Sequence, residues 1–471
     1  MSNDLILNTM KRMYIMMMLL LTGIVAEAQT SVWDGSRKIW TRGSGTETDP
    51  YLIESAEQLA FLSYMVNKSF DTQGLYFFLT TDIDLNGSED QQWKPIGLYD
   101  KGFDEDGCDR GKPYNTGYNP YPMFRGHFDG GGHVISNIYV DNEGGYAGLF
   151  GYADSWIADE SAVIENLWVS NGYIHGSTCG GIIGKGAKCE VSNCRNGADI
   201  EGSMVGGIMG SGGIKVSNCS NVGRLTGMNV GGIVGDRSGA EVTECFNEGD
   251  IAASRIAGGI LCNSLRATLD NCYNTGAVSA IGDSSTYYPM AGGLVGTATY
   301  NGTAVSNSYN VGEVTGNHYV GCLLGYVSSP EAVSFENCYY LDDCYESEHG
   351  TPKSAEEMRA ETFVNVLNQG DVVWGFDVNH INDGFPVLVR TDLSVDSHAE
   401  KELIIYPNPT SGMVIIEGKE VAQVQVYNIL GQVVRTFSTN RINVGDLRED
   451  IYLLQITDRE GLIHSTKLVV E

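Results

Sequence analysis

A segment of 25 to 27 residues repeats through the middle of the chain and limits the fold more than any other feature does. Each repeat has two landmarks, a glycine pair followed by apolar residues and a cysteine that follows a polar residue. Both landmarks shift together along the chain, so they belong to one unit. A unit this short cannot bury its own apolar face, and its neighbours must therefore stack on it. The landmark residues are Gly181, Gly207, Gly232, Gly259 and Gly293 for the glycine pairs, and Cys194, Cys219, Cys245, Cys272 and Cys338 for the cysteines.

The segments between these landmarks predict short strands rather than helices. A turn signal with Asn and Gly follows each cysteine, as at Asn196 and Asn221, and a short apolar strand follows the turn. No unit contains a capped run with the helical period. Stacked parallel units place equivalent residues about 4.8 Å apart. The sequence therefore predicts a mainly β fold, a right-handed parallel β-helix-like solenoid with capping helices.

The cysteine spacing indicates a buried ladder of thiols rather than a set of disulfides. A ladder repeat of about 4.8 Å exceeds the Cβ separation that a disulfide prefers. Ser308 takes the cysteine position in one unit. Cys262 and Cys322 replace glycines of the first landmark, and we expect both to pack in the core. Four cysteines lie off the ladder and are disulfide candidates: Cys108, Cys179, Cys189 and Cys344.

These landmarks resemble the GLUG motif, a family of glycine-rich repeats in bacterial surface proteins. The resemblance covers residues 146 to about 340, and we expect the GLUG repeat solenoid to occupy 146–345. The chain departs from the pattern at Leu167, which stands in a cysteine position, and in the wider step from Cys272 to Ser308. The resemblance implies a surface or adhesive setting and no fixed chemistry.

The N-terminal 28 residues predict an export signal. Lys11 and Arg12 precede a short apolar run, and Ala26-Glu27-Ala28 forms a small-x-small cleavage site. The run is too short to span a bilayer, and no later segment is apolar enough to do so. We therefore expect export through the inner membrane and no integral membrane span.

The regions that flank the repeats predict caps. Residues 29–145 are expected to cap the start of the solenoid, and Ser55 with Gln58 predicts a capped helix there. Residues 346–390 are expected to cap its end, and Ser354 with Glu357 predicts a second helix that reaches about Leu367. Residues 391–402 are polar without an apolar period and indicate a linker.

The last segment, 403–471, has strand-like runs at 413–416, 424–427 and 452–456 and predicts a separate small β domain. It resembles the C-terminal sorting domain of the type IX secretion system of Bacteroidetes, and the resemblance implies a small immunoglobulin-like β-sandwich. The resemblance implies export across the outer membrane and makes the type IX secretion machinery a partner. The residues that carry it are Tyr406, Pro407, Asn408, Pro409, Gly431, Lys467, Leu468 and Val469.

The net negative charge of the chain limits the classes of partner that it is expected to bind. The formal net charge is −30, which repels nucleic acid and anionic membranes. A glycan or an extracellular protein remains as the expected partner.

The sequence offers no catalytic motif. It contains no HExxH, no GxSxG, no P-loop and no CxxC pair, so we expect neither catalytic residues nor a metal or other cofactor. A calcium-loop spacing runs from Asp82 to Asp90, but Trp93 stands where that loop needs a glutamate. A strand with a polar turn is the favoured interpretation there. Asp104, Asp106 and Asp109 are read as a solvated cluster, with weak calcium binding left open.

Two classes of function remain. The favoured one is a non-catalytic adhesive or binding module for a glycan or for a host or matrix protein, whose tyrosines stack on sugars. The alternative is a carbohydrate-active β-helix enzyme, a polysaccharide lyase or hydrolase, and a plain spacer is the third possibility. Turn carboxylates at Asp199, Glu248, Asp250 and Glu313 are candidates for such an enzyme, but no pair of them is reinforced by a nearby histidine or arginine as an acid–base pair. The candidate ligand-binding tyrosines are Tyr287, Tyr288, Tyr300 and Tyr319. Ordinary packing is the favoured interpretation of these four residues, because tyrosine is common in β-rich proteins, and a sugar-stacking face is the alternative.

Overall fold

The chain forms two compact units, Met1–Thr391 and Asp392–Glu471. The computed structural model describes residues 30–98, 122–155, 161–213, 215–236, 239–283, 288–299, 302–344, 349–370, 372–378, 380–389, 404–406, 410, 412–417, 421–428, 433–448, 450–458 and 463–470. The expected signal peptide and linker lie outside these residues. No helix among the described residues is long and apolar enough to cross a membrane.

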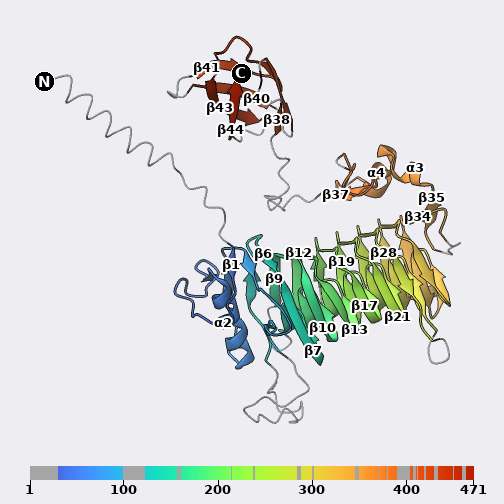
Figure 1. The fold of residues 1–471 in the computed structure, drawn as a ribbon. Coiled ribbons are helices and arrows are strands. Elements are labelled where there is room, and N and C mark those ends of the chain that lie inside the picture. The colour runs from blue at the N-terminus through green and yellow to red at the C-terminus, as the bar shows by residue number, and fades with distance from the viewer. Residues whose placement is uncertain are drawn as a thin grey trace. The chain divides into compact units, whose positions relative to one another are not determined.

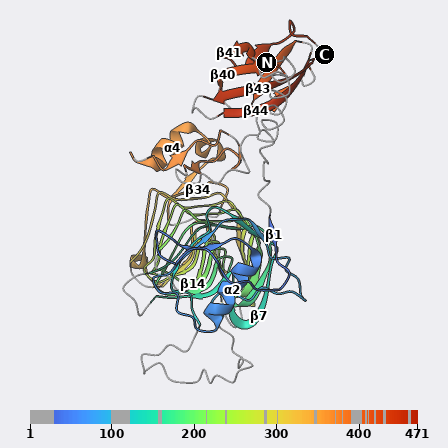
Figure 2. The same cartoon turned by 90° about the vertical axis from the view of Figure 1, so that its left-hand side faces the viewer.

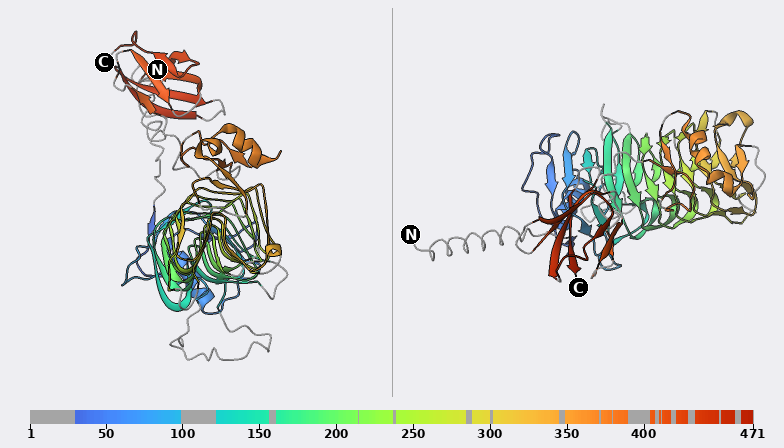
Figure 3. Two further views of the ribbon diagram at one scale, coloured as in Figure 1. Left: turned by 90° about the vertical axis from the view of Figure 1, so that its right-hand side faces the viewer. Right: turned by 90° about the horizontal axis from the view of Figure 1, so that it is seen from above.

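The first unit is a parallel β-helix, as the repeats predict. Each coil gives strands to three sheets, and neighbouring coils pair in parallel along each of them. Figure 1 shows the strands stacked side by side in chain order, and the end-on views in Figures 2 and 3 show the coils wound about a common interior.

We number the sheets 1 to 3. Sheet 1 contains β1 (Ser31–Val32), β2 (Tyr51–Ile53), β3 (Tyr76–Leu79), β4 (Ile83–Asp84), β5 (His127–Asp129), β6 (Val134–Ser136), β9 (Ala162–Val169), β12 (Cys189–Asn196), β15 (Lys215–Ser217), β16 (Ser220–Asn221), β19 (Glu241–Thr243), β20 (Phe246–Asn247), β23 (Thr268–Asp270), β24 (Tyr273–Asn274), β28 (Thr303–Ser306), β29 (Tyr309–Asn310), β33 (Val333–Glu336), β34 (Tyr339–Leu341) and β35 (Thr351–Lys353).

Sheets 2 and 3 contain the remaining strands of the stack. Sheet 2 contains β7 (Ile138–Ala147), β10 (Gly172–Gly180), β13 (Asp199–Gly206), β17 (Leu225–Gly231), β21 (Ile251–Gly258), β25 (Val278–Ala280), β26 (Met290–Gly292), β30 (Val314–Gly316) and β31 (Tyr319–Gly321). Sheet 3 contains β8 (Phe150–Ala153), β11 (Ile183–Gly186), β14 (Met209–Gly212), β18 (Val234–Asp236), β22 (Leu261–Ser264), β27 (Val295–Ala298) and β32 (Leu324–Val327).

Parallel pairing begins earlier than the repeats do. Strands β1 to β6, in the region expected only to cap the stack, already pair in parallel within sheet 1. Helix α2 (Ala56–Asn67) begins after Ser55, as expected, but the predicted capping box is wrong. The Ser55 side chain caps nothing, and the Gln58 amide oxygen instead accepts from the Glu54 N–H at 2.6 Å.

The segment 346–390 folds back along the stack. It holds α3 (Ala355–Met358), α4 (Glu361–Asn368) and an antiparallel pair, β36 (Trp374–Gly375) with β37 (Val387–Leu388); a 3-10 turn, η2 (Pro330–Ala332), precedes it. The predicted capping box of Ser354 and Glu357 is present, but the single predicted helix is two helices. Their apolar side packs on Tyr273 and Tyr309 of sheet 1, and Figure 2 shows α4 beside the coils next to β34.

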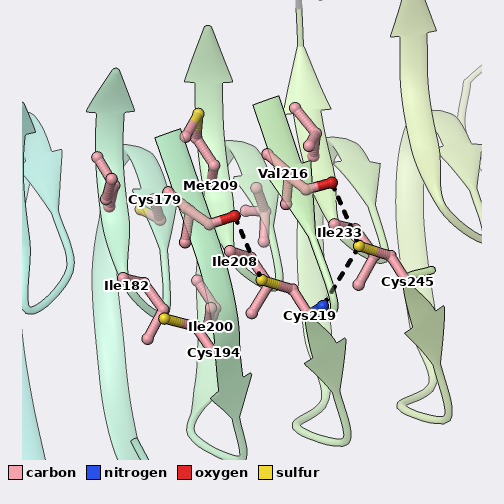
Figure 4. Close-up of a cluster of buried hydrophobic side chains, with 14 of the residues drawn as sticks. Cys179, Ile182, Cys194, Ile200, Ile208, Met209, Val216, Cys219, Ile233 and Cys245 are labelled. Carbon is pink, nitrogen blue, oxygen red and sulfur yellow. Dashed lines mark hydrogen bonds between the residues drawn. The ribbon is translucent and has the colours of Figure 1, made fainter. Parts of the chain in front are cut away.

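A cysteine ladder lies inside the coils (Figure 4). Cys194, Cys219, Cys245, Cys272 and Cys338 are buried and form no disulfide. Each thiol lies within hydrogen-bond reach of a carbonyl oxygen in its own coil and of one in the preceding coil, as Cys219 does with Ser217 and Val191. Burial raises the thiol pKa of Cys272 to about 12, which keeps the sulfur protonated as a donor.

Two expectations about the other cysteines are wrong and one is incomplete. Cys322 is buried in the core as expected, but it also forms a disulfide with Cys344, 22 residues later. Cys179 and Cys189 are buried without a disulfide, because they enter the core from sheets 2 and 1. Cys344 was a disulfide candidate, and this expectation is confirmed. Cys262 is buried in the core as expected, and Cys108 lies outside the described residues.

A second ladder, of asparagine amides, accompanies the thiols. From Asn196 to Asn274, each amide Nδ2 donates to the Oδ1 of the next asparagine at 2.7 to 2.8 Å, and also to a backbone carbonyl two residues on. All of these side chains are buried. Sequence reasoning treated them only as turn signals. The ladder consists of Asn196, Asn221, Asn247, Asn274 and Asn310.

The glycine pairs are required by this amide ladder. A Cβ on Gly232 would lie 1.9 Å from the Gly259 carbonyl oxygen and 2.7 Å from the Asn247 Cβ. The same contact recurs between Gly207 and Asn221. The glycine landmark therefore touches the asparagine that stands two residues after the cysteine landmark, which explains why the two landmarks shift together along the chain.

The polar residue before each cysteine has a separate role. It takes a left-handed backbone conformation, with φ between 51° and 54° at Asn193, Asn218, Glu244, Asn271 and Asn337. Asparagine tolerates this region better than most residues. The turn it makes directs the following cysteine inward.

The second unit is a small antiparallel β-domain with its own core. One sheet contains β38 (Ile404–Tyr406), β39 (Met413–Glu417) and β42 (Arg441–Asn443). The other contains β40 (Val421–Tyr427), β41 (Val433–Phe437), β43 (Asp450–Asp458) and β44 (Ile463–Val470). The predicted runs at 413–416, 424–427 and 452–456 all lie within these strands.

Candidate functional site

Two of the predicted tyrosines meet at the C-terminal end of the stack. The rings of Tyr288 and Tyr319 lie 6.1 Å apart, edge to face. His318 lies against both rings, at 4.2 Å and 4.7 Å, and Tyr326 lies 4.9 Å from Tyr319. We call Tyr288, His318, Tyr319 and Tyr326 the aromatic cluster. Tyr287 and Tyr300, the other two predictions, lie outside the described residues.

The fold of one coil produces this cluster. Tyr319 begins β31 of sheet 2 and Tyr326 lies in β32 of sheet 3, so the two rings meet across the tight turn that joins these strands. Tyr146 and Tyr152 meet in the same way in an early coil, at 5.8 Å. Aligning the repeats on the glycine pair places these tyrosines at similar offsets, and that signal was overlooked.

A second group of polar side chains lies on the outer face of sheet 2. Asp141, His175 and Glu201 occupy the same register position in β7, β10 and β13. The His175 Nδ1 lies 2.6 Å from the Asp141 Oδ1, and the Tyr173 hydroxyl donates to the Glu201 Oε2 at 3.0 Å. Sequence reasoning missed this group because its members are 34 and 26 residues apart and pair only through the register.

A pocket of about 420 Å³ lies beside this row, and we call it the sheet-2 pocket. Gly176, Gly202 and Gly227 follow one another at the next register position and leave the backbone bare along its lining. In the following coil Ala253 takes that position. At the other end β7 has two residues more than β10 between paired positions, and this irregularity brings Glu143 into the lining. The hollow thus lies between two local breaks in register, that of β7 with β10 and that of β17 with β21. The three glycines allow the coils to pack closely beneath it, since a Cβ on Gly202 would meet the buried Cys179 and Val205 side chains.

The charges at this face keep the tyrosines protonated. Partial burial, together with the hydrogen bond to Glu201 and its negative charge, raises the pKa of Tyr173 to about 12. Desolvation and the carboxylates Glu89 and Asp141 also raise the pKa of Tyr139, whose ring lies 5.7 Å from that of Tyr173. Tyr173 is therefore a hydroxyl donor at neutral pH.

In the segment from Asp82 to Asp90, whose spacing resembles a calcium loop, the carboxylates of Asp82 and Asp84 accept hydrogen bonds that hold the fold together. The Asp82 carboxylate accepts from His133 and from the Val134 N–H, and that of Asp84 accepts from the Asn86 N–H and the Asn137 amide. Asp104, Asp106 and Asp109 lie outside the described residues. Within the described part of the chain, no three His, Cys, Asp or Glu side chains gather in a metal-ligating arrangement.

The turn carboxylates also have structural partners. Asp199 accepts from the Arg224 N–H and Asp250 from the Ala277 N–H, each linking one coil to the next. These bonds hold turns in register, and they bring no acid–base pair together.

Comparisons with known proteins identify a family for the second unit. Residues 404–471 match the family model described as a secretion system C-terminal sorting domain. A putative Gly-rich membrane protein of Evansella cellulosilytica is 29% identical over 148 residues, 31% of this chain and 14% of that protein. Halomucin of Haloquadratum walsbyi is 29% identical over 171 residues, 36% of this chain and 2% of halomucin. The ulvan lyase NLR42 of Nonlabens ulvanivorans is 32% identical over 90 residues, 18% of this chain and 17% of that enzyme.

This chain thus spans less than a fifth of the length of each of these relatives. The family match covers the two antiparallel sheets of the second unit. Residues 404–471 are therefore a C-terminal sorting domain of the type IX secretion system, and the chain is a protein exported to the cell surface or the extracellular space.

Proposed function

We propose that this protein is a non-catalytic glycan-binding module, delivered by its sorting domain, and that the aromatic cluster binds sugar rings. The observation that carries the proposal is the exposure of the cluster: Tyr288 is 53% exposed and Tyr319 is 36% exposed, although both rings are in mutual contact. Tyrosine rings normally bury most of their surface. A preassembled, solvent-facing group of rings is typical of a surface that stacks on a flat apolar partner such as the face of a sugar.

Three further observations support this function. The landmarks of the repeats resemble the GLUG repeats of surface proteins, and we take the solenoid to be of this type. The sorting domain supplies the route of export. The relative named as an ulvan lyase supports a carbohydrate as the ligand class, but the overlap of 90 residues carries no lyase reaction to this chain.

The test is affinity electrophoresis of the full chain through gels that contain a panel of soluble polysaccharides. We expect retardation by at least one polysaccharide, and we expect Tyr288→Ala with Tyr319→Ala to weaken it about tenfold, since each ring contributes about 0.5 to 1.5 kcal/mol. The matched control is Tyr64→Ala, because Tyr64 is 38% exposed on α2, far along the chain from the cluster.

Equal retardation of the double variant and the wild type would contradict a role of the cluster. Absence of retardation by every polysaccharide would contradict the glycan as ligand. Each polysaccharide that binds is also incubated with the protein and assayed for new reducing ends. Their appearance would overturn the non-catalytic assignment in favour of a carbohydrate-active enzyme.

A further inference from the structure

The sheet-2 pocket is a second recessed surface, and its lining differs in chemistry from the aromatic cluster. The side chains that line it are the carboxylates of Glu143 and Glu201, the imidazole of His175 and the hydroxyls of Ser177, Ser203 and Thr226. Among the described residues that line the pocket there is no lysine or arginine. The site thus carries negative charge and offers hydrogen-bond acceptors. Glycines without side chains lie between these groups.

The orientation of these groups is held by neighbours outside the pocket. Asp141 lies on the Nδ1 side of His175, so the Nε2 edge of the ring points away from Asp141. Tyr173 holds the Glu201 Oε2 and leaves the second oxygen of that carboxylate for another donor. Groups fixed in this way lose little conformational freedom when a ligand binds.

The charge of the lining selects the ligand class. Two carboxylates in one pocket of a chain with net charge −30 repel uronates and sulfated sugars. An ammonium group reverses that sign and forms charge-assisted hydrogen bonds with carboxylates. The three hydroxyls match further hydroxyl groups on the same ligand.

We propose that the sheet-2 pocket binds an amino sugar with a free amine, with its ammonium on Glu201 and its hydroxyls on Ser177, Ser203 and Thr226, while Glu143, on the far side of β10, adds to the negative charge of the lining. This site is separate from the aromatic cluster, and the proposal stands without it. The pocket volume of about 420 Å³ admits a sugar unit rather than a folded peptide.

The test is calorimetric titration of the full chain with a glucosamine tetramer at pH 6 and physiological salt, where the amines are protonated. The N-acetylated tetramer of the same length is the ligand control. We expect the amine form to bind at least tenfold more tightly than the acetylated form. We expect Glu201→Gln to weaken binding of the amine form at least tenfold, because the variant keeps the shape and removes the charge.

The matched control is Glu241→Gln, which removes the same charge from the exposed start of β19 on sheet 1. Equal losses in both glutamine variants would show non-specific attraction to an acidic surface and would overturn the proposal. Equal affinity for the two tetramers, or no binding of either, would overturn it as well. A second variant, Ser203→Trp, fills the exposed rim without changing charge and is expected to abolish binding.

The titration is repeated with the Tyr288→Ala and Tyr319→Ala variant. Unchanged binding of the amine tetramer there is the expected result, and it separates this pocket from the aromatic cluster. Loss of binding in that variant would place the amino sugar on the cluster and overturn the assignment to the pocket.

Discussion

Two rows of residues run along the same coils and follow different rules. In the interior, asparagine recurs at one position from Asn196 to Asn310. On the outer face of sheet 2, the position of Asp141 is taken in the following coils by His175, Glu201 and Thr226. The coil is the same in both cases, but only the interior row must match its neighbours above and below. A residue type that repeats from coil to coil therefore indicates a position that holds the stack together. A position whose residue varies from coil to coil is one that is free to contact a ligand.

The largest expected effect comes from a substitution of one glycine that packs against the interior row of asparagines. Gly232→Ala would drive a methyl group into the Gly259 carbonyl and the Asn247 side chain, and we expect a loss of about 4 kcal/mol or more in the free energy of unfolding. Urea unfolding followed by circular dichroism measures it. Gly239→Ala is the control, since its nearest neighbour would lie 3.8 Å away. Equal stability of the two variants would contradict the role of the glycine pair.

The next largest effect is expected from a substitution that removes one amide from the ladder. Asn247→Ala loses the bonds to Asn221, Asn274 and the Gly249 carbonyl and leaves buried partners unsatisfied, and we expect a cost of about 3 kcal/mol. Asn317→Ala, at an exposed asparagine with one hydrogen bond to Gly282, should cost less than about 1 kcal/mol. The same unfolding experiment compares them, and similar costs would argue against a cooperative ladder.

A smaller effect tests the thiols. Cys245→Ser should cost no more than about 1.5 kcal/mol, because Ser308 already serves in this ladder, accepting from the Cys272 N–H and donating to the Ser306 carbonyl. Cys245→Leu overfills the same site and should cost about 1 to 3 kcal/mol. Thermal unfolding of both variants measures the order, and a serine variant less stable than the leucine variant would show that the sulfur itself is required.

The smallest effect concerns an ion pair on the outer side of sheet 1. The hydrogen bond from His127, at 2.6 Å, holds the pKa of Glu165 below its usual value. Because the folded pKa is lowered, this stabilisation is present above about pH 4.5 and is lost as the pH falls through the folded pKa. We expect Glu165→Gln to be less stable than the wild type by about 0.5 kcal/mol at pH 6 and equal to it at pH 3. A constant difference across this range would contradict the assignment.

The sequence predicted the parallel stack because its interior residues repeat at nearly constant spacing. It did not predict the amide ladder, since Asn196 and its equivalents also fit a turn signal, and a turn residue is usually exposed. It named Tyr288 and Tyr319 as candidates but neither His318, which lies against both rings, nor Tyr326, which contacts Tyr319 across the turn between two sheets. The sheet-2 pocket depends on the register break between β7 and β10, and the spacing of the repeats does not predict that break.

The amide ladder also has a direction. Each internal asparagine, Asn221, Asn247 and Asn274, donates its Nδ2 to the next coil toward the C-terminus and accepts from the coil before it, so each internal unit presents the same donor ahead and the same acceptor behind. A gene segment that duplicates one unit would therefore splice into the row without leaving an unmatched group. The terminal members differ, because the Asn196 Oδ1 accepts from the Ala198 N–H and Asn310 faces Tyr340 in the next coil. The direction of the ladder thus makes one whole coil the unit by which this row can be lengthened with every donor matched to an acceptor.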